Sequence, residues 1–167
     1  MPVDIDAQEL LQRAVESFHG TKRSGQQQMV QTIVDGLVAG GHRIIQAGTG
    51  TGKSLGYLVP AAAHALSEGG GAVVVSTATI ALQRQLMEKD LPSLAQAILE
   101  EYGLTLTYAV LKGRNNYVCL QKLHSAIPDP EGEALFEVSR GALGDQAVAV
   151  RAWANETDTG DKDDFGD

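Results

Sequence analysis

The stretch AGTGTGKS, residues 47–54, combines three glycines with a lysine and a serine. Glycines let a backbone curl until several of its N–H groups point at one anion. The spacing Ala47-x-x-x-x-Gly52-Lys53-Ser54 matches a phosphate-binding loop, with alanine in place of the first glycine. In such a loop the lysine reaches the β and γ phosphates and the serine hydroxyl ligates Mg²⁺. We therefore expect nucleotide binding by Ala47, Gly48, Thr49, Gly50, Thr51, Gly52, Lys53 and Ser54, with Lys53 and Ser54 as the catalytic pair and Ser54 as the Mg²⁺ ligand.

The surroundings of this loop support the prediction. RIIQA, residues 43–47, reads as a short buried strand, and a helical pattern runs from Leu55 to Leu66. A loop that opens a helix presents the anion-attracting helix N-terminus to its ligand. The alternative, a glycine-rich turn that binds nothing, does not explain this strand–loop–helix order.

Two further strands and several helices complete the predicted fold. AVVVST, residues 72–77, is rich in β-branched residues, which is typical of a strand buried on both faces. LTLTYAVL, residues 104–111, is the third expected strand. Helical patterns precede, separate and follow the strands, at residues 6–18, 26–38, 55–66, 79–89, from Pro92 onward, 117–126, 131–143 and 145–154. Alternating strands and helices predict an α/β fold with a parallel sheet, here incomplete and open at one edge.

Composition limits the protein class. The 167 residues suit about one domain, and a single cysteine excludes an internal disulfide. The sequence shows no bilayer-spanning run and no signal-peptide core, so we expect a cytoplasmic protein. Net charge is −8, and residues 155–167 carry six of the acidic residues, so this tail is expected to be disordered. Nucleic-acid binding needs only a local basic track, so net charge leaves that question open.

Three other segments also bear on function, and two of them allow more than one interpretation. In RSGQQQM, residues 23–29, Gln26 could read the edge of adenine, or the glutamines could be a solvated helix start. In STATIALQRQL, residues 76–86, the threonines could bind a backbone phosphate, cap a helix, or do both. In LKGRNNYVCL, residues 111–120, the cysteine could be a core residue and the basic side chains solvated loop charges.

Taken together, these segments resemble the DinG/XPD group of iron–sulfur DNA helicases in superfamily two, and most closely the bacterial DinG type. The resemblance covers most of residues 20–125, and WANETDTGD resembles the segment between the first and second cluster cysteines of that family. It implies a RecA-like P-loop NTPase motor at residues 1–112. The start of the helical iron–sulfur insertion would follow at 113–154, and the acidic tail at 155–167.

The resemblance also implies roles for single residues. Gln26 is similar to the adenine-reading glutamine, with Arg23 before it. Cys119 is similar to the first of four ligands of a [4Fe–4S] cluster, and ATP with Mg²⁺ would be the other cofactors. The positions similar to contacts with single-stranded or forked DNA are Thr77, Thr79, Gln83, Lys112 and Arg114.

Three features of the family are missing from this sequence. It has no acid box to position the attacking water, no further cysteines, and no room for a second motor domain. Phosphoryl transfer depends on such positioning, so we expect a truncated helicase segment that binds ATP without unwinding DNA alone. The alternative is a stand-alone P-loop module that regulates a partner. A small-molecule kinase is disfavoured because Ser76 and Thr77 stand where that class needs a carboxylate.

Overall fold

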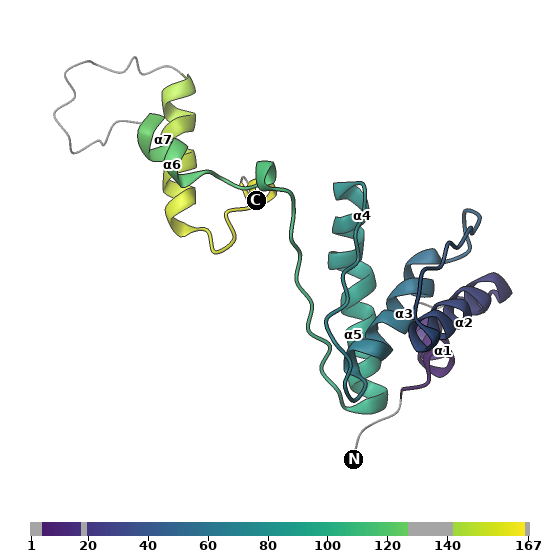
Figure 1. Ribbon diagram of the computed structural model, residues 1–167. Coiled ribbons are helices and arrows are strands. Elements are labelled where there is room, and N and C mark those ends of the chain that lie inside the picture. Colours follow the sequence, from purple (N-terminus) through teal and green to yellow (C-terminus); the bar gives the residue numbers. More distant parts are fainter. Residues whose placement is uncertain (1–4, 18–19, 127–141, 166–167) are drawn as a thin grey trace, which may run out of the picture. The chain divides into compact units, whose positions relative to one another are not determined.

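The computed structural model describes residues 5–17, 20–126 and 142–165 (Figure 1). The chain divides into two compact units, residues 1–110 and residues 111–167. This division falls beside the domain boundary predicted at residue 112, while the identity of each domain stays a prediction.

The first unit is built from packed helices. They are α1 (Ala7–Ser17), α2 (Ser24–Ala39), α3 (Lys53–Leu66), α4 (Ile80–Gln85), a π-helical turn (Leu86–Asp90) and α5 (Leu91–Tyr102). Helix α1 contacts α2, α3 and α5, and α2 packs along α3. Helices predicted from the spacing of apolar residues are confirmed here. None of the helices in the described ranges is both long and apolar enough to cross a membrane.

One apolar core holds these helices together. Leu10, Val30, Val59, Leu94 and Ile98 are each fully buried, and they come from four different helices. Burial of a side chain of this size stabilises a fold by roughly 1.5–3 kcal/mol. The core therefore fixes α3, the helix that begins at the end of the glycine-rich loop.

The segment from Ile80 to Tyr102 differs from the prediction. We predicted two helices with a break before Pro92, but α4, the π-helical turn and α5 follow one another without an intervening loop. Pro92 lies in the first turn of α5. Proline has no backbone N–H to donate, which the first turn of a helix tolerates. The wider π-helical turn before it lets the segment continue into α5 without a loop.

The three predicted strands are not formed as strands. Residues 43–47, 72–77 and 104–111 carry no regular secondary structure, and no ladder joins them within the described residues. The expected burial is also not found, since Ile44 is 102% exposed and Val74 is 89% exposed. A strand satisfies its backbone only through a neighbouring strand, and the described residues offer none to these segments. The parallel sheet therefore remains a prediction.

The second unit contains a 3₁₀ turn (Arg114–Asn116), α6 (Leu120–Ala126), α7 (Ala142–Glu156) and a 3₁₀ turn (Lys162–Asp164). The helices predicted at 117–126 and 145–154 correspond to α6 and α7. The one predicted at 131–143 lies almost wholly outside the described residues. An isolated antiparallel bridge joins Tyr117 to Asp161.

The acidic tail differs from the expectation of disorder. Residues 155 and 156 end α7, and residues 157–165 form a hydrogen-bonded turn. The rings of Trp153 and Phe165 meet edge to face, with centroids 5.3 Å apart. The prediction considered only net charge, whereas several of these acids accept hydrogen bonds from nearby backbone or side-chain donors.

Candidate functional site

The glycine-rich loop leads directly into α3. Gly50 and Gly52 adopt left-handed backbone angles, with φ of 78° and 80°. Gly52 is the N-cap residue of α3, and Lys53 is its first helical residue. Only glycine takes this conformation without strain, so the two positions explain why the loop needs glycines there.

Lys53 lies over its own loop. Its ammonium donates to the carbonyl oxygens of Ala47 at 3.2 Å and Gly48 at 2.9 Å. The Thr51 hydroxyl also donates to the Gly48 carbonyl, at 2.8 Å. The lysine is exposed, and its ammonium makes no ion pair within the described residues. A phosphate that enters the loop would exchange these neutral acceptors for charged ones, which form stronger hydrogen bonds with an ammonium.

The start of α2 contacts the same loop. Gln26 is buried, at 4% exposure, and its Nε2 donates to the Gly52 carbonyl at 2.8 Å. The Arg23 guanidinium donates to the Gly50 carbonyl. The solvated-start interpretation therefore holds for Gln27 and Gln28, which are exposed, and is wrong for Gln26. The structure brings together the two residues predicted on the adenine side and the phosphate loop, while adenine reading itself stays a prediction.

The sequence analysis did not single out Tyr57, which lies next to Ser54, or Asp90, whose charge acts on Tyr57. Burial raises the pKa of Tyr57, the Asp90 carboxylate adds to this, and a hydrogen bond with Ser54 acts in the opposite direction. Asp90 is itself buried and accepts from Gln85 Nε2 at 3.0 Å. The position of Tyr57 three residues after Ser54 is a signal that the sequence contained, because side chains at that helical spacing are neighbours. Asp90 carried no such local signal.

The predicted nucleic-acid contacts of the first unit gather at the start of α4. Thr79 is its N-cap, and its hydroxyl accepts from the Leu82 N–H at 3.3 Å. The Thr77 hydroxyl donates to the Thr79 carbonyl at 3.2 Å. Gln83 follows in the first turn and is half-buried. The capping interpretation is confirmed for Thr79, and the phosphate interpretation stays a prediction for all three residues.

We expect Thr79→Ala to lower the free energy of unfolding by about 1 kcal/mol, because it removes the oxygen that caps α4. Thr79→Ser keeps a hydroxyl and should stay close to the wild type. Urea denaturation followed by circular dichroism measures both changes. Equal losses in the two variants would show that the cap oxygen does not stabilise the helix.

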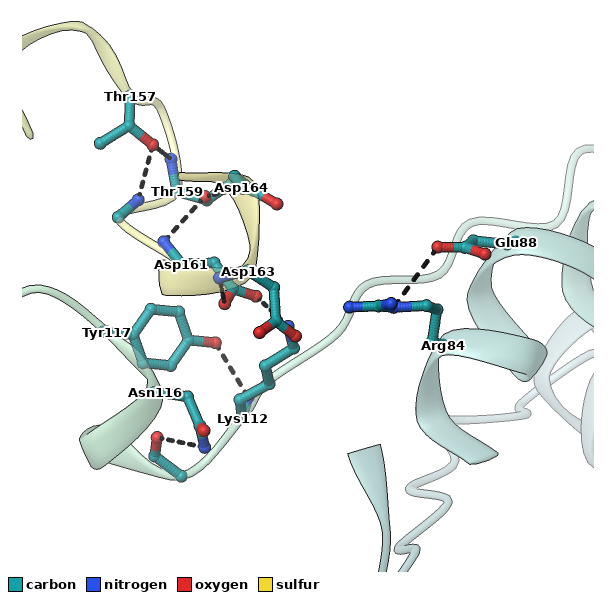
Figure 2. A network of polar contacts seen from close by, with 12 residues as sticks. Arg84, Glu88, Lys112, Asn116, Tyr117, Thr157, Thr159, Asp161, Asp163 and Asp164 are labelled. Atoms are coloured by element: carbon teal, nitrogen blue, oxygen red, sulfur yellow. Dashed lines mark hydrogen bonds and ion pairs between the residues drawn. The ribbon is translucent and has the colours of Figure 1, made fainter. Parts of the chain in front are cut away.

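In the second unit, Lys112 and Arg114 have different surroundings. The Lys112 ammonium pairs with the carboxylates of Asp161 and Asp163 (Figure 2). These two partners, Asp161 first, raise the pKa of Lys112 above its usual 10.5. The pairs therefore contribute stability at pH values below 10.5, and this is lost as pH rises through the higher folded-state value. Arg114 is exposed and starts the 3₁₀ turn.

Cys119 is exposed, so the core-packing interpretation is wrong for it. A four-iron cluster takes four thiolates, and the chain has one cysteine. The described residues also contain no group of three or more His, Cys, Asp or Glu side chains that could hold a metal. The side chains of this chain therefore do not fit a complete cluster, and Cys119 could supply at most one ligand.

Comparisons with known proteins agree with the loop geometry. Residues 23–129 match the family of DEAD/DEAH box helicases. The chain is 44% identical to the ATP-dependent helicase DinG of Mycobacterium tuberculosis, over 98% of this chain and 26% of the relative. It is 34% identical to the ATP-dependent DNA helicase YoaA of Escherichia coli, over 90% of this chain and 21% of the relative. It is 32% identical to the 3'-5' exonuclease DinG of Bacillus subtilis, over 84% of this chain and 14% of the relative. No solved structure matches it.

Proposed function

Because the chain belongs to the DEAD/DEAH box helicases, and within them to the DinG type, we propose that it forms the ATP-binding segment of an ATP-dependent DNA helicase. It spans about a quarter of the length of the Mycobacterium tuberculosis relative. Unwinding of DNA is therefore a proposal for the whole motor, and ATP binding is the proposal for this segment.

The observation that carries the proposal is the loop that ends in Lys53. Gly52 in the left-handed conformation turns the chain into α3, and the ammonium of Lys53 lies over the loop backbone. The buried amide of Gln26 and the guanidinium of Arg23 bind the same loop from α2. A single site thus combines groups suited to phosphates with groups suited to a nucleobase.

Within this site each residue has a distinct task. The N–H groups at the start of α3 and the Lys53 ammonium would bind the phosphates of ATP. Ser54 would ligate Mg²⁺, which would neutralise part of the charge on the phosphates. The sequence holds no acid box that could position water, so we expect ATP binding with little hydrolysis from this chain alone.

The RecA-like sheet belongs to the same proposal. Residues 43–47, 72–77 and 104–111 are rich in apolar residues and lack regular structure, and Ile44 and Val74 are largely exposed. Parallel sheets are stable when both faces are covered, so these segments would pair as strands once further strands join them. The three segments would then become the central strands of the motor domain.

Nucleic acid is the proposed partner. Thr77, Thr79 and Gln83 lie at the start of α4, where hydroxyl and amide groups suit a DNA backbone. Single-stranded or forked DNA would contact these residues, together with a basic residue of the 112–119 segment. We propose the cytoplasm as the location of this activity, because both DNA and ATP would be available there.

We expect ATP to displace a fluorescent ATP analogue from the chain, in the presence of Mg²⁺, at a concentration at least about tenfold lower than AMP. AMP lacks the phosphates that Lys53 would bind, and a charged hydrogen bond accounts for a difference of that order. Fluorescence anisotropy measures the competition, and a sample with Mg²⁺ removed by chelation provides the control. Equal competition by AMP and ATP would contradict the phosphate role of the loop.

A further inference from the structure

The acidic turn, residues 157–165, encloses the side chain of Lys112. Its ammonium contacts the carboxylate of Asp161 and, at 2.9 Å, that of Asp163. The Lys112 side chain is only 11% exposed, and that of Asp161 only 8%. Two carboxylates therefore occupy the positions that phosphate oxygens would need in order to reach this lysine.

The acidic turn is also joined to the Cys119 loop, residues 112–119, through its backbone. The Val118 N–H donates to the Gly160 carbonyl at 2.8 Å, beside the bridge between Tyr117 and Asp161. On the other side, the Lys162 ammonium donates to the Asn115 carbonyl at 2.7 Å. The acidic turn therefore contacts the Cys119 loop at two places, at Asn115 and at Tyr117 with Val118.

The Cys119 loop closes on itself at its first residue. The Lys112 N–H donates to the Tyr117 hydroxyl at 2.9 Å (Figure 2). The backbone of Lys112 is therefore bonded to Tyr117 of the same loop, and its side chain is paired with the acidic turn. Between these ties lies the 3₁₀ turn that begins at Arg114.

The acidic turn is itself internally braced. The Thr157 hydroxyl accepts from the Gly160 N–H at 3.0 Å, and the Asp161 carboxylate accepts from the Asp163 N–H at 3.1 Å. The Thr159 hydroxyl donates to Asp164 at 2.7 Å. A braced turn can hold a charge in place at a lower entropic cost than a free acidic tail.

We propose that Asp161 and Asp163 clamp Lys112 in order to position the Cys119 loop, and that Arg114 rather than Lys112 is its phosphate contact. Arg114 is exposed, and its guanidinium makes no ion pair within the described part of the chain. Lys112 could reach a phosphate only by giving up both carboxylates, whereas Arg114 needs no such exchange. The role of Arg114 rests on the proposed binding of DNA, but the clamp does not.

An arginine-specific protease tests the clamp without any nucleic acid. We expect Asp161→Asn to speed cleavage after Arg114 by about tenfold in the whole chain. Loss of the largely buried ion pair between Lys112 and Asp161 would favour local opening of the loop. Asp158→Asn is the matched control, since Asp158 is exposed and lies in the same turn. Mass spectrometry follows the cleavage, and equal rates in the two variants would overturn the proposal.

A second variant guards against simple unfolding of the unit. Asp163→Asn keeps the Asp161 carboxylate, which pairs with Lys112 and accepts from the N–H of residue 163, so it should also speed cleavage after Arg114, though less. Fluorescence of Trp153, the only tryptophan, reports whether its contact with Phe165 persists. Unchanged fluorescence with faster cleavage supports the clamp, and an Asp163→Asn variant cleaved at the wild-type rate contradicts it.

Binding of a fluorescent single-stranded oligonucleotide tests the role of Arg114. We expect Asp161→Asn to weaken binding by about threefold relative to Asp158→Asn, and this loss should vanish in an Arg114→Ala background. A purely structural role of Asp161 would weaken both backgrounds equally. Tighter binding by Asp161→Asn than by its control would show that the acids shield Lys112, which would overturn the proposal. If the wild type binds no oligonucleotide, the proposed DNA function fails while the cleavage test still decides the clamp.

Discussion

Replacement of Lys53 by alanine is expected to raise the dissociation constant for ATP by about 10- to 100-fold. One charge-assisted hydrogen bond contributes roughly 1.5–3 kcal/mol, and each 1.4 kcal/mol is a factor of about ten. The ammonium already lies over the loop, at 2.9 Å from the Gly48 carbonyl, so it need not be recruited from elsewhere. Anisotropy of a fluorescent ATP analogue measures the affinity.

Lys89→Ala is the matched control, because Lys89 is an exposed lysine of the π-helical turn with no proposed role. It removes the same charge and should leave the affinity unchanged. The melting temperature of Lys53→Ala should stay near that of the wild type, since its side chain is exposed. An unchanged affinity in Lys53→Ala, in a folded protein, would remove the phosphate role from this lysine.

The helices were predictable because their signal is local. Apolar residues of α1 recur at helical spacing, and Leu10, Leu11, Ala14 and Val15 are all buried. The same holds for the loop, because the spacing of Gly52, Lys53 and Ser54 specifies a turn into a helix whatever packs around it. Features fixed by neighbours in the chain are the ones that the sequence could specify.

The strands show the opposite case. Val73, Val74 and Val75 have strong strand propensity, yet each is at least 41% exposed. Propensity describes how well a residue suits a pleated, covered surface, but the cover must come from other parts of a fold. A run of valines cannot specify which partner will pair with it, so the expectation of a buried strand went beyond the local signal.

The surroundings of Lys112 could not be predicted for a similar reason. In the sequence it stands two residues before Arg114, and the two looked alike as loop charges. Its partners Asp161 and Asp163 lie about fifty residues later, in a tail that was expected to be disordered. Only the folded turn shows that one cation is enclosed and the other exposed.

Gly52→Ala is the second change with a large expected effect, a loss of roughly 2–3 kcal/mol in the free energy of unfolding. A residue with a Cβ at a φ of 80° carries left-handed strain of about 1–2 kcal/mol. The added Cβ would also collide with Nε2 of Gln26, which must then leave the Gly52 carbonyl at a further cost of about 1 kcal/mol. Urea denaturation measures the total, and ATP affinity should fall as the loop is distorted.

Gly69→Ala separates the two contributions, because Gly69 has a φ of 76° but no atom within 4 Å of the added Cβ. It should cost only the backbone strain, so the difference between the two variants measures the collision with Gln26. In a Gln26→Ala background the collision cannot occur, and Gly52→Ala should then cost no more than Gly69→Ala. If the difference persists in that background, the buried amide of Gln26 is not what constrains position 52, and the link from α2 to the phosphate loop would need another basis.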